Sequence, residues 1–350
     1  MVKVKNVVAA ALMFCASAAM ASNFRVADQV YLLAGAHAGG ISGTFLSDVY
    51  ISNLSTDAVG VSMIYSTSTG GTQQTFGSST SPWFVLQPNE RREIVDFFAA
   101  PQVQGGLGLT SAPTGQVIFN ACKQGGNCDL TTCPNGQSSG VCPDFRNISV
   151  ESRIYSIPPG TVLSGNPPTK GQLFSGYAWY SFVSSDAASA GLDKIFITGL
   201  RNTGGTFYRS NLGFVNASQF STTTLVIKLF NGATNAQIGS NATVTLSPLG
   251  HTQLNIDSAQ LFPSFSGSTA TNAYVTVEQT NTQATGDAAL NGCPNGCPAF
   301  FAYGSVLDNQ SGDATTLEPQ YLKPLTDAAI NCIYNLVCKG SFNPRRAVKH

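Results

Sequence analysis

Charged side chains are scarce in this sequence. They make up 10% of its 350 residues, whereas about 25% is usual in globular proteins. The 18 Lys and Arg residues match the 18 Asp and Glu residues in number and gather in no basic stripe. Nucleic acids and anionic lipids are bound through such stripes, so the sequence argues against both kinds of partner. Hydrophobic content is ordinary at 43%, which excludes a disordered composition.

Long hydrophobic runs are missing after residue 21. The apolar stretch at 7–20 follows Lys3 and Lys5 and ends in small residues, and it is shorter than the roughly 20 residues that span a bilayer. This pattern predicts a signal peptide over residues 1–21, cleaved before Ser22. Lipidation at Cys15 is the alternative, which the bulky residue before it disfavours. We expect no membrane span and a location outside the cell or on its outer surface, with the periplasm as the alternative.

Signatures of catalysis are missing too. The chain has three histidines, His37, His251 and His350, and no Gly-x-Ser-x-Gly elbow positions a serine for them. We expect His37 in an exposed loop and His251 in a turn. Glu90 and Glu93 flank two arginines and indicate a solvated charge cluster rather than a glycosidase pair. We therefore expect no enzymatic activity, no catalytic residue and no cofactor.

Cysteines are few but even in number once Cys15 leaves with the signal peptide. An even number in an exported chain predicts disulfides. In the simplest pairing, each cysteine bonds to its neighbour in the sequence, as Cys122–Cys128, Cys133–Cys142, Cys293–Cys297 and Cys332–Cys338. A zinc site in segment 122–142 is the alternative, but the spacing lacks a Cys-x2-Cys pair and export favours oxidation. We therefore favour disulfides and expect no metal there.

Short apolar and β-branched runs alternate with Gly, Ser, Asn and Pro clusters. Runs at this spacing predict the strands of an all-β sandwich or barrel. The expected strands in the first part of the chain are 29–36, 44–53, 59–66, 83–87, 92–98, 115–121 and 148–155. Helical periodicity is confined mainly to 326–337, near the C-terminus.

An internal repeat organises these strands. The segment 43–53, GTFLSDVYISN, is matched by 205–216, with one extra residue in the second copy. Four further pairs follow in the same order: 59–65 with 224–230, 86–96 with 246–257, 116–119 with 273–277, and 148–155 with 300–307. A repeat of this length predicts two copies of one domain.

The sequence thus predicts an all-β protein of two tandem immunoglobulin-like (Ig-like) antiparallel β-sandwich domains with a short C-terminal helical segment. Pro-rich turns within 158–175 predict a linker between the domains. The expected parts are the signal peptide 1–21, domain 1 at 22–157, the linker 158–175, domain 2 at 176–320, and a helical, disulfide-stapled tail at 321–350.

The repeated strand motif, Gly-Thr-aromatic-x-x-Asp/Asn followed by a hydrophobic strand, resembles a loosely defined set of exported bacterial proteins with tandem Ig-like sandwich domains. The resemblance covers most of residues 30–315, and the closing segment 303–313 looks like the final strand and turn of these proteins. It implies fold and export. It implies no activity and no site residues.

Two segments are candidates for ligand binding. Asp308, Asn309, Ser311 and Asp313 place oxygen ligands around a glycine turn and could bind calcium, although the same residues also make ordinary hairpin turns. The alternating aromatic segment 176–182 predicts a strand with Tyr177 and Trp179 on one face. That face is a candidate platform for stacking on sugars, unless a neighbouring domain buries it.

We expect a non-enzymatic structural or adhesive protein of the cell surface, with a surface protein or glycan as partner. One alternative is a carbohydrate-binding or hydrolytic accessory protein. The other is a subunit of an extracellular filament that self-associates through its edge strands, since unprotected edges pair readily with other chains.

Overall fold

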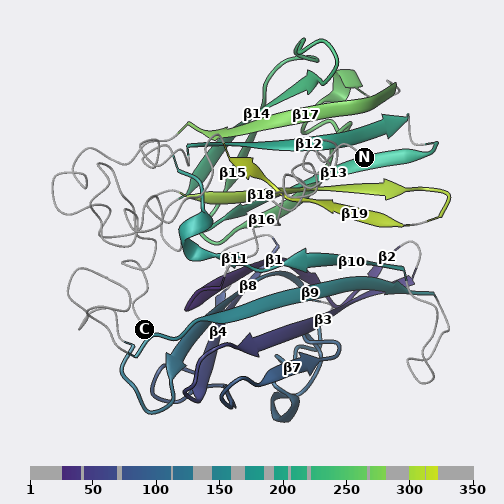
Figure 1. Cartoon of the computed structure of the whole chain (residues 1–350). Helices are drawn as coiled ribbons and strands as arrows, with labels where there is room; N and C mark the ends of the chain where they lie inside the picture. Colours follow the sequence, from purple (N-terminus) through teal and green to yellow (C-terminus); the bar gives the residue numbers. More distant parts are fainter. Residues whose placement is uncertain are drawn as a thin grey trace, which may run out of the picture.

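We describe the protein from a computed structural model. The described residues are 26–40, 43–68, 73–111, 113–128, 144–158, 170–184, 193–203, 206–218, 222–265, 269–280, 299–311 and 313–321. The expected signal peptide (1–21) and all but the first residue of the expected tail (321–350) lie outside these residues. The expected all-β class is confirmed, and the sheets are antiparallel (Figure 1).

The N-terminal half, which we define as strands β1 to β11, forms two sheets. Sheet A has the order β10-β9-β3-β2, with β7 also paired to β3, and sheet B has the order β11-β1-β8-β4-β5, with β6 also paired to β4. The strands are β1 (Gln29–Ala36), β2 (Ala38–Gly40), β3 (Gly43–Asn53), β4 (Val59–Thr67), β5 (Gln73–Phe76), β6 (Phe84–Leu86), β7 (Arg91–Ile94), β8 (Thr114–Lys123), β9 (Ile148–Ile157), β10 (Lys170–Ser175) and β11 (Tyr177–Ala178).

The C-terminal half, strands β12 to β20, also forms two sheets. Sheet D has the order β15-β14-β17-β12-β20, and sheet C has the order β16-β13-β18-β19. The strands are β12 (Lys194–Thr203), β13 (Tyr208–Asn216), β14 (Thr223–Asn231), β15 (Ala242–Leu246), β16 (His251–Asn255), β17 (Thr269–Gln279), β18 (Phe300–Asp308), β19 (Ala314–Leu317) and β20 (Gln320–Tyr321). Three short 3-10 helices also occur in the described chain: η1 (Gln102–Gln104), η3 (Trp179–Ser181) and η5 (Pro263–Phe265).

The strands that the two halves share are in the same order, and the N-terminal half adds β2 and β5. Strands β1, β8 and β4 are neighbours in sheet B as β12, β17 and β14 are in sheet D, and β9, β3 and β7 correspond to β18, β13 and β16. The five pairs of segments that the repeat matched all fall on strands holding the same place in their sheets. We call residues at the same register position in the two halves counterparts.

Counterpart serines tie neighbouring strands together in the same way. Ser47 accepts a hydrogen bond from the Ala36 amide at 2.8 Å and donates to the Ala36 carbonyl at 3.0 Å. Ser210 makes the same two bonds with Arg201, at 2.9 and 2.6 Å. Each hydroxyl thus uses its donor and an acceptor lone pair to hold the end of β1 or β12 against the opposite sheet.

Counterpart asparagines brace the next turn. The Asn53 amide donates to the Gln87 carbonyl at 2.9 Å, and its oxygen accepts from the Ser55 amide at 2.9 Å. Asn216 donates to the Ser247 carbonyl and accepts from the Ser218 amide, again at 2.9 Å each. Both asparagines are fully buried, so the repeat preserves a polar brace inside each half.

Two expected boundaries are wrong. Residues 170–175, expected within the linker, form β10, which pairs with β9 in full register. Tyr177 and Ala178, expected to open domain 2, pair with Val30 and Tyr31 of sheet B instead. Apolar residues near the Pro-rich segment, such as Phe174, are buried against the neighbouring strands. The free energy of burying these side chains outweighs the preference of the Pro-rich sequence for an irregular linker.

We predict that Asn216→Ala and Asn53→Ala each lower the free energy of unfolding by about 2–3 kcal/mol, because truncation strands buried backbone groups without partners. Urea denaturation measures the loss. Asn241→Ala, at an exposed position, is the control and should change stability by less than about 0.5 kcal/mol. Equal small effects at all three positions would contradict the brace.

Candidate functional site at the junction of the two halves

Aromatic rings join the two halves. The Tyr31 and Phe301 rings lie 5.3 Å apart between centroids, those of Tyr177 and Phe301 lie 5.7 Å apart, and those of Phe174 and Tyr303 lie 5.4 Å apart. All five side chains are buried. They belong to a hydrophobic cluster that runs from the core of the N-terminal half into sheet C, so a continuous apolar seam joins the halves.

Polar contacts fix the orientation across this seam. The Gln116 amide donates to the Leu249 carbonyl at 2.8 Å. On the neighbouring side, where β10 and β19 meet, Gln172 donates to Thr316 at 2.6 Å and Thr316 donates to the Leu173 carbonyl at 2.6 Å. Directional bonds from two separate strands, β8 and β10, oppose sliding of one half on the other.

Leu249 has a strained backbone conformation in the seam. Its φ is 49°, in the left-handed region, where its counterpart turn in the N-terminal half carries Asn89 at 58°. A leucine there costs about 1–2 kcal/mol, which an asparagine partly avoids. Leu249 is fully buried in the junction cluster, and burying its side chain offsets that cost by about 1.5–3 kcal/mol.

His251 is a buried histidine of the junction. Its side chain is 8% exposed, its Nε2 lies 3.1 Å from the Tyr303 hydroxyl, and that hydroxyl donates to Gln253 Oε1 at 3.1 Å. The Tyr303 hydroxyl thus lies between His251 Nε2 and the Gln253 side chain, and the donor and acceptor roles of the two imidazole nitrogens depend on the tautomer. Nδ1 is buried without a hydrogen-bond partner, which costs about 1–3 kcal/mol. Burial lowers the pKa of this imidazole to about 4.

A groove of about 450 Å³ lies beside His251. It opens between the edge strands β15 and β16 of the two C-terminal sheets, and Ser68 of the N-terminal half closes one side. Its size is within the usual 300–1,000 Å³ of ligand sites. In the repeat, Arg91 and Arg92 of the first copy align with the shorter side chains of His251 and Thr252 in the second. The sequence analysis did not recognise this difference as a sign of a groove.

The pair of His37 and Asp96 is a structural contact. His37 Nδ1 lies 2.8 Å from Asp96 Oδ1, and burial raises the pKa of this carboxyl against the opposing effect of the histidine. The same place in the C-terminal half holds Asn202, which donates to Asp257 at 3.4 Å. Because an asparagine can replace the histidine, the contact serves to tie β1 or β12 to the following turn. His251 itself begins β16, so its expected place in a turn is wrong.

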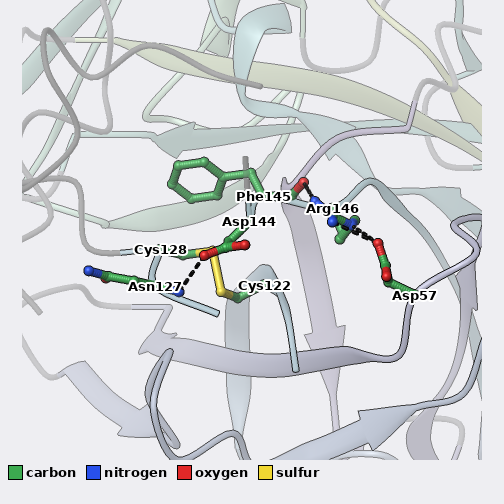
Figure 2. Close-up of a disulfide and its surroundings, with 7 residues drawn as sticks. All are labelled: Asp57, Cys122, Asn127, Cys128, Asp144, Phe145 and Arg146. Carbon is green, nitrogen blue, oxygen red and sulfur yellow. Dashed lines mark hydrogen bonds and ion pairs between the residues drawn. A yellow bond between two sulfur atoms is a disulfide. The ribbon is translucent and has the colours of Figure 1, made fainter. Parts of the chain in front are cut away.

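The disulfide Cys122–Cys128 is confirmed, with Cα atoms 5.9 Å apart (Figure 2). It closes the end of β8, where Asp144 accepts from the Asn127 amide at 2.8 Å. Arg146 bonds to Asp57 at 2.6 Å nearby and holds the pKa of that carboxyl below its usual value. The remaining expected disulfide cysteines lie outside the described residues: Cys133, Cys142, Cys293, Cys297, Cys332 and Cys338.

The candidate calcium residues form a hydrogen-bonded turn between β18 and β19. Asp308 Oδ1 accepts from the Gln310 amide at 2.8 Å and from the Ser311 amide at 3.2 Å. Ser311 Oγ accepts from the Asp313 amide at 3.1 Å, and Asn309 donates its amide to the Phe207 carbonyl at 2.7 Å. Within the described part of the chain, no group of three His, Cys, Asp or Glu residues could hold a metal. Calcium binding here stays a prediction.

The candidate sugar platform is wrong at its predicted residues. Tyr177 is 4% exposed and Trp179 is 1% exposed. The expected alternating strand breaks after Ala178 into η3, and Trp179 donates to Asp28 at 3.2 Å. Rings buried in the junction cannot stack on a ligand in solvent. The alternative considered for this segment, burial by a neighbouring domain, is what the structure has.

No family model matches the chain, and no curated protein matches it. Among solved structures, it is similar to a biofilm-associated protein BSP domain at 9% identity and a TM-score of 0.18, over 86% of this chain and 59% of that one. The chain thus spans less than two thirds of that protein, and so low a score carries no argument about function. Among the described residues, no helix is long and apolar enough to cross a bilayer.

We predict that Cys122→Ser with Cys128→Ser lowers the free energy of unfolding by about 2 kcal/mol, because the open loop gains entropy in the unfolded chain. Urea denaturation under oxidising conditions measures the loss. Either single substitution is the control and should cause a similar loss, since each breaks the same bond. An unchanged midpoint in the double variant would show that the disulfide adds no stability.

We predict that stability falls by about 2 kcal/mol between pH 7 and pH 5 through His251 alone. The pKa in the folded protein, about 4, lies below the ordinary 6.5, so the unfolded chain binds the proton first. The contribution is complete above about pH 6.5 and is lost as the pH falls toward 4.

Urea denaturation at both pH values, with the wild type and His251→Phe, measures this contribution. The variant should lose about 2 kcal/mol less than the wild type on acidification. His37→Asn, which copies the residue in the other half, is the control for removing a histidine. Equal losses in the wild type and His251→Phe would contradict the prediction.

Proposed function

We propose that this chain is an exported, non-enzymatic structural or adhesive protein of the cell surface, built from two copies of one Ig-like sandwich domain. The copies are supported by the shared strand order and by the matching bonds of Ser47 with Ser210 and Asn53 with Asn216. Chance does not reproduce both the order of the sheets and their internal side-chain bonds.

The apolar seam is the observation that carries this proposal. Domains joined by small polar contacts move relative to one another, whereas a large hydrophobic interface holds them as one body. Here Tyr31, Phe301 and Tyr303 are each at most 2% exposed in a cluster that both halves share. Such a unit behaves as a stiff spacer, which suits a protein that must hold a binding surface away from a cell.

Export is supported by the predicted signal peptide, the Cys122–Cys128 disulfide and the scarcity of charge. The disulfide fits an oxidising compartment. The low charge leaves strand faces rich in Thr, Ser and Asn, which suit exposed sheet surfaces outside the cell.

Expression of the full chain in a bacterial host tests the proposal. We expect cleavage before Ser22, oxidised cysteines by non-reducing peptide mapping, and removal by protease added to intact cells. Beads carrying residues 22–350 should be retained under flow on glycan- or protein-coated glass more than beads carrying an unrelated exported β-sandwich protein. Retention at the level of that control, or an uncleaved chain with free thiols inside the cell, would contradict the proposal.

A further inference from the structure

Strand β15 forms an edge of sheet D, and in the described chain it pairs only with β14. The Thr280 amide donates to the Thr224 carbonyl at 2.9 Å. Thr224 therefore turns its backbone groups toward β17 and away from Thr245, its register partner on β15. Because backbone groups alternate in direction along a strand, the N–H and C=O groups of Thr243 and Thr245 face the open edge of the sheet.

The corresponding edge in the N-terminal half is blocked. By strand register, Val85 of β6 is the counterpart of Thr245. The Arg92 guanidinium donates to the Val85 carbonyl at 2.8 Å and lies 5.1 Å from the centre of the Phe84 ring. Glu90 Oε1 accepts from the same guanidinium at 2.7 Å. A bonded carbonyl and a charged side chain at this place oppose pairing of β6 with another strand.

This protection is missing from the C-terminal half. Thr252 takes the place of Arg92 by strand register. Thr243 and Thr245 have exposed side chains, and within the described chain their edge-facing backbone groups have no hydrogen-bond partner. No Asp, Glu, Lys or Arg belongs to β15, and none of the described ones lines the groove beside it. Charged side chains are a usual protection of sheet edges, so β15 is open to pairing.

We propose that β15 pairs with β15 of a second copy of this chain, antiparallel about a two-fold axis at Val244. Identical strands related by a two-fold axis perpendicular to their sheet run antiparallel and keep the same faces. Thr243 then lies opposite the partner's Thr245, and both have backbone groups at the edge. Each such pair exchanges both of its N–H···O=C bonds, so sheet D of one copy continues into sheet D of the other.

The side chains of β15 suit this pairing. Thr243 and Thr245 meet threonines on the outer face, and cross-strand Thr–Thr pairs are favourable. On the inner face, Val244 lies beside the partner's Val244, next to the groove that Leu246 and Leu254 also line. The strand is uncharged, so no like charges meet across the axis. A neutral edge is complementary in charge to its own copy, whereas a charged edge repels it.

An extended segment of a different protein is the competing occupant, since open edges also accept foreign strands. The second copy is favoured because its own edge supplies the required register, the matching faces and the neutrality. The pairing requires only the folded chain, so it goes beyond the proposed adhesive function and does not rest on it.

Sedimentation equilibrium of residues 22–350 tests the proposal. We expect a reversible dimer with a dissociation constant below about 100 µM. The double variant Thr243→Lys with Thr245→Lys places lysines opposite one another and should raise this constant at least about tenfold. Both positions are exposed, so the variant should keep the urea midpoint of the wild type.

Opposite charges should restore the pairing. The variant with Thr243→Glu and Thr245→Glu should also be a monomer by itself. Mixed in equal amounts with the lysine variant, it should form a heterodimer, because each lysine then lies opposite a glutamate. The matched control is Gln73→Lys with Thr75→Lys, at two exposed positions of β5, an edge strand of sheet B. This control should change the dissociation constant less than about twofold.

Thr252→Arg is an independent test, because it restores the blocking residue of the N-terminal half without changing β15. It should raise the dissociation constant at least about fivefold, since the guanidinium competes for the edge carbonyl of Thr245.

Several results would overturn the proposal. One is a monomer at about 1 mM protein. Another is wild-type association in both the lysine variant and Thr252→Arg. A lysine–glutamate mixture that stays monomeric would reject the antiparallel register, and loss of the dimer in the β5 control would place the interface elsewhere. A monomer whose β15 edge binds an extended Ser/Thr-rich peptide would assign this edge to a foreign strand instead.

Discussion

The packing of Tyr31 against Phe301 is the contact on which the rest of the arrangement depends. It buries the outer face of β1, whose inner face already packs in the core, so seven of the eight residues of this strand are buried. Its counterpart β12 has no half packed on it and alternates between buried and partly exposed positions. The same strand position is therefore buried on both faces in the N-terminal half and on one face in the C-terminal half, because residues of the C-terminal half cover β1.

The two halves share their interior and differ on their outward faces. The serine and asparagine braces recur with nearly identical distances. On the outer face, Tyr303 of sheet C takes the place of Glu151 of sheet A, and His251 takes the place of Arg91. A charged face stays in water, whereas a neutral aromatic face can be buried without desolvating ions. The neutral aromatic face of sheet C, which packs on the N-terminal half, is consistent with this cost of desolvating ions.

Local patterns predicted much of this fold because strand formation depends on short-range alternation and turn chemistry. The expected segment 29–36 has the bounds of β1, and 148–155 falls within β9. The Cys122–Cys128 bond could be predicted because the two cysteines are only six positions apart in the chain. The segment 92–98 was predicted too long because Asp96 adopts a φ of 51° and ends the strand after Ile94. The Asp96 amide donates a hydrogen bond to Oδ1 of the distant Asp48, which holds that conformation, and no local pattern contains this contact.

The all-β class and the local disulfide could be predicted from the sequence alone, because each depends on residues close together in the chain. The repeat could be found there too, because matching segments can be compared however far apart they lie. Tertiary structure alone decided which faces are buried. Tyr177 and Trp179 have the pattern of a half-exposed strand, yet contacts with residues more than 100 positions away bury them. Tertiary structure also decided the candidate site beside His251. The groove and the unpartnered nitrogen of His251 depend on small side chains of two edge strands, on Ser68 from the other half and on the Tyr303 hydroxyl. Packing of one half on the other brings these groups together, and no stretch of sequence shows them side by side.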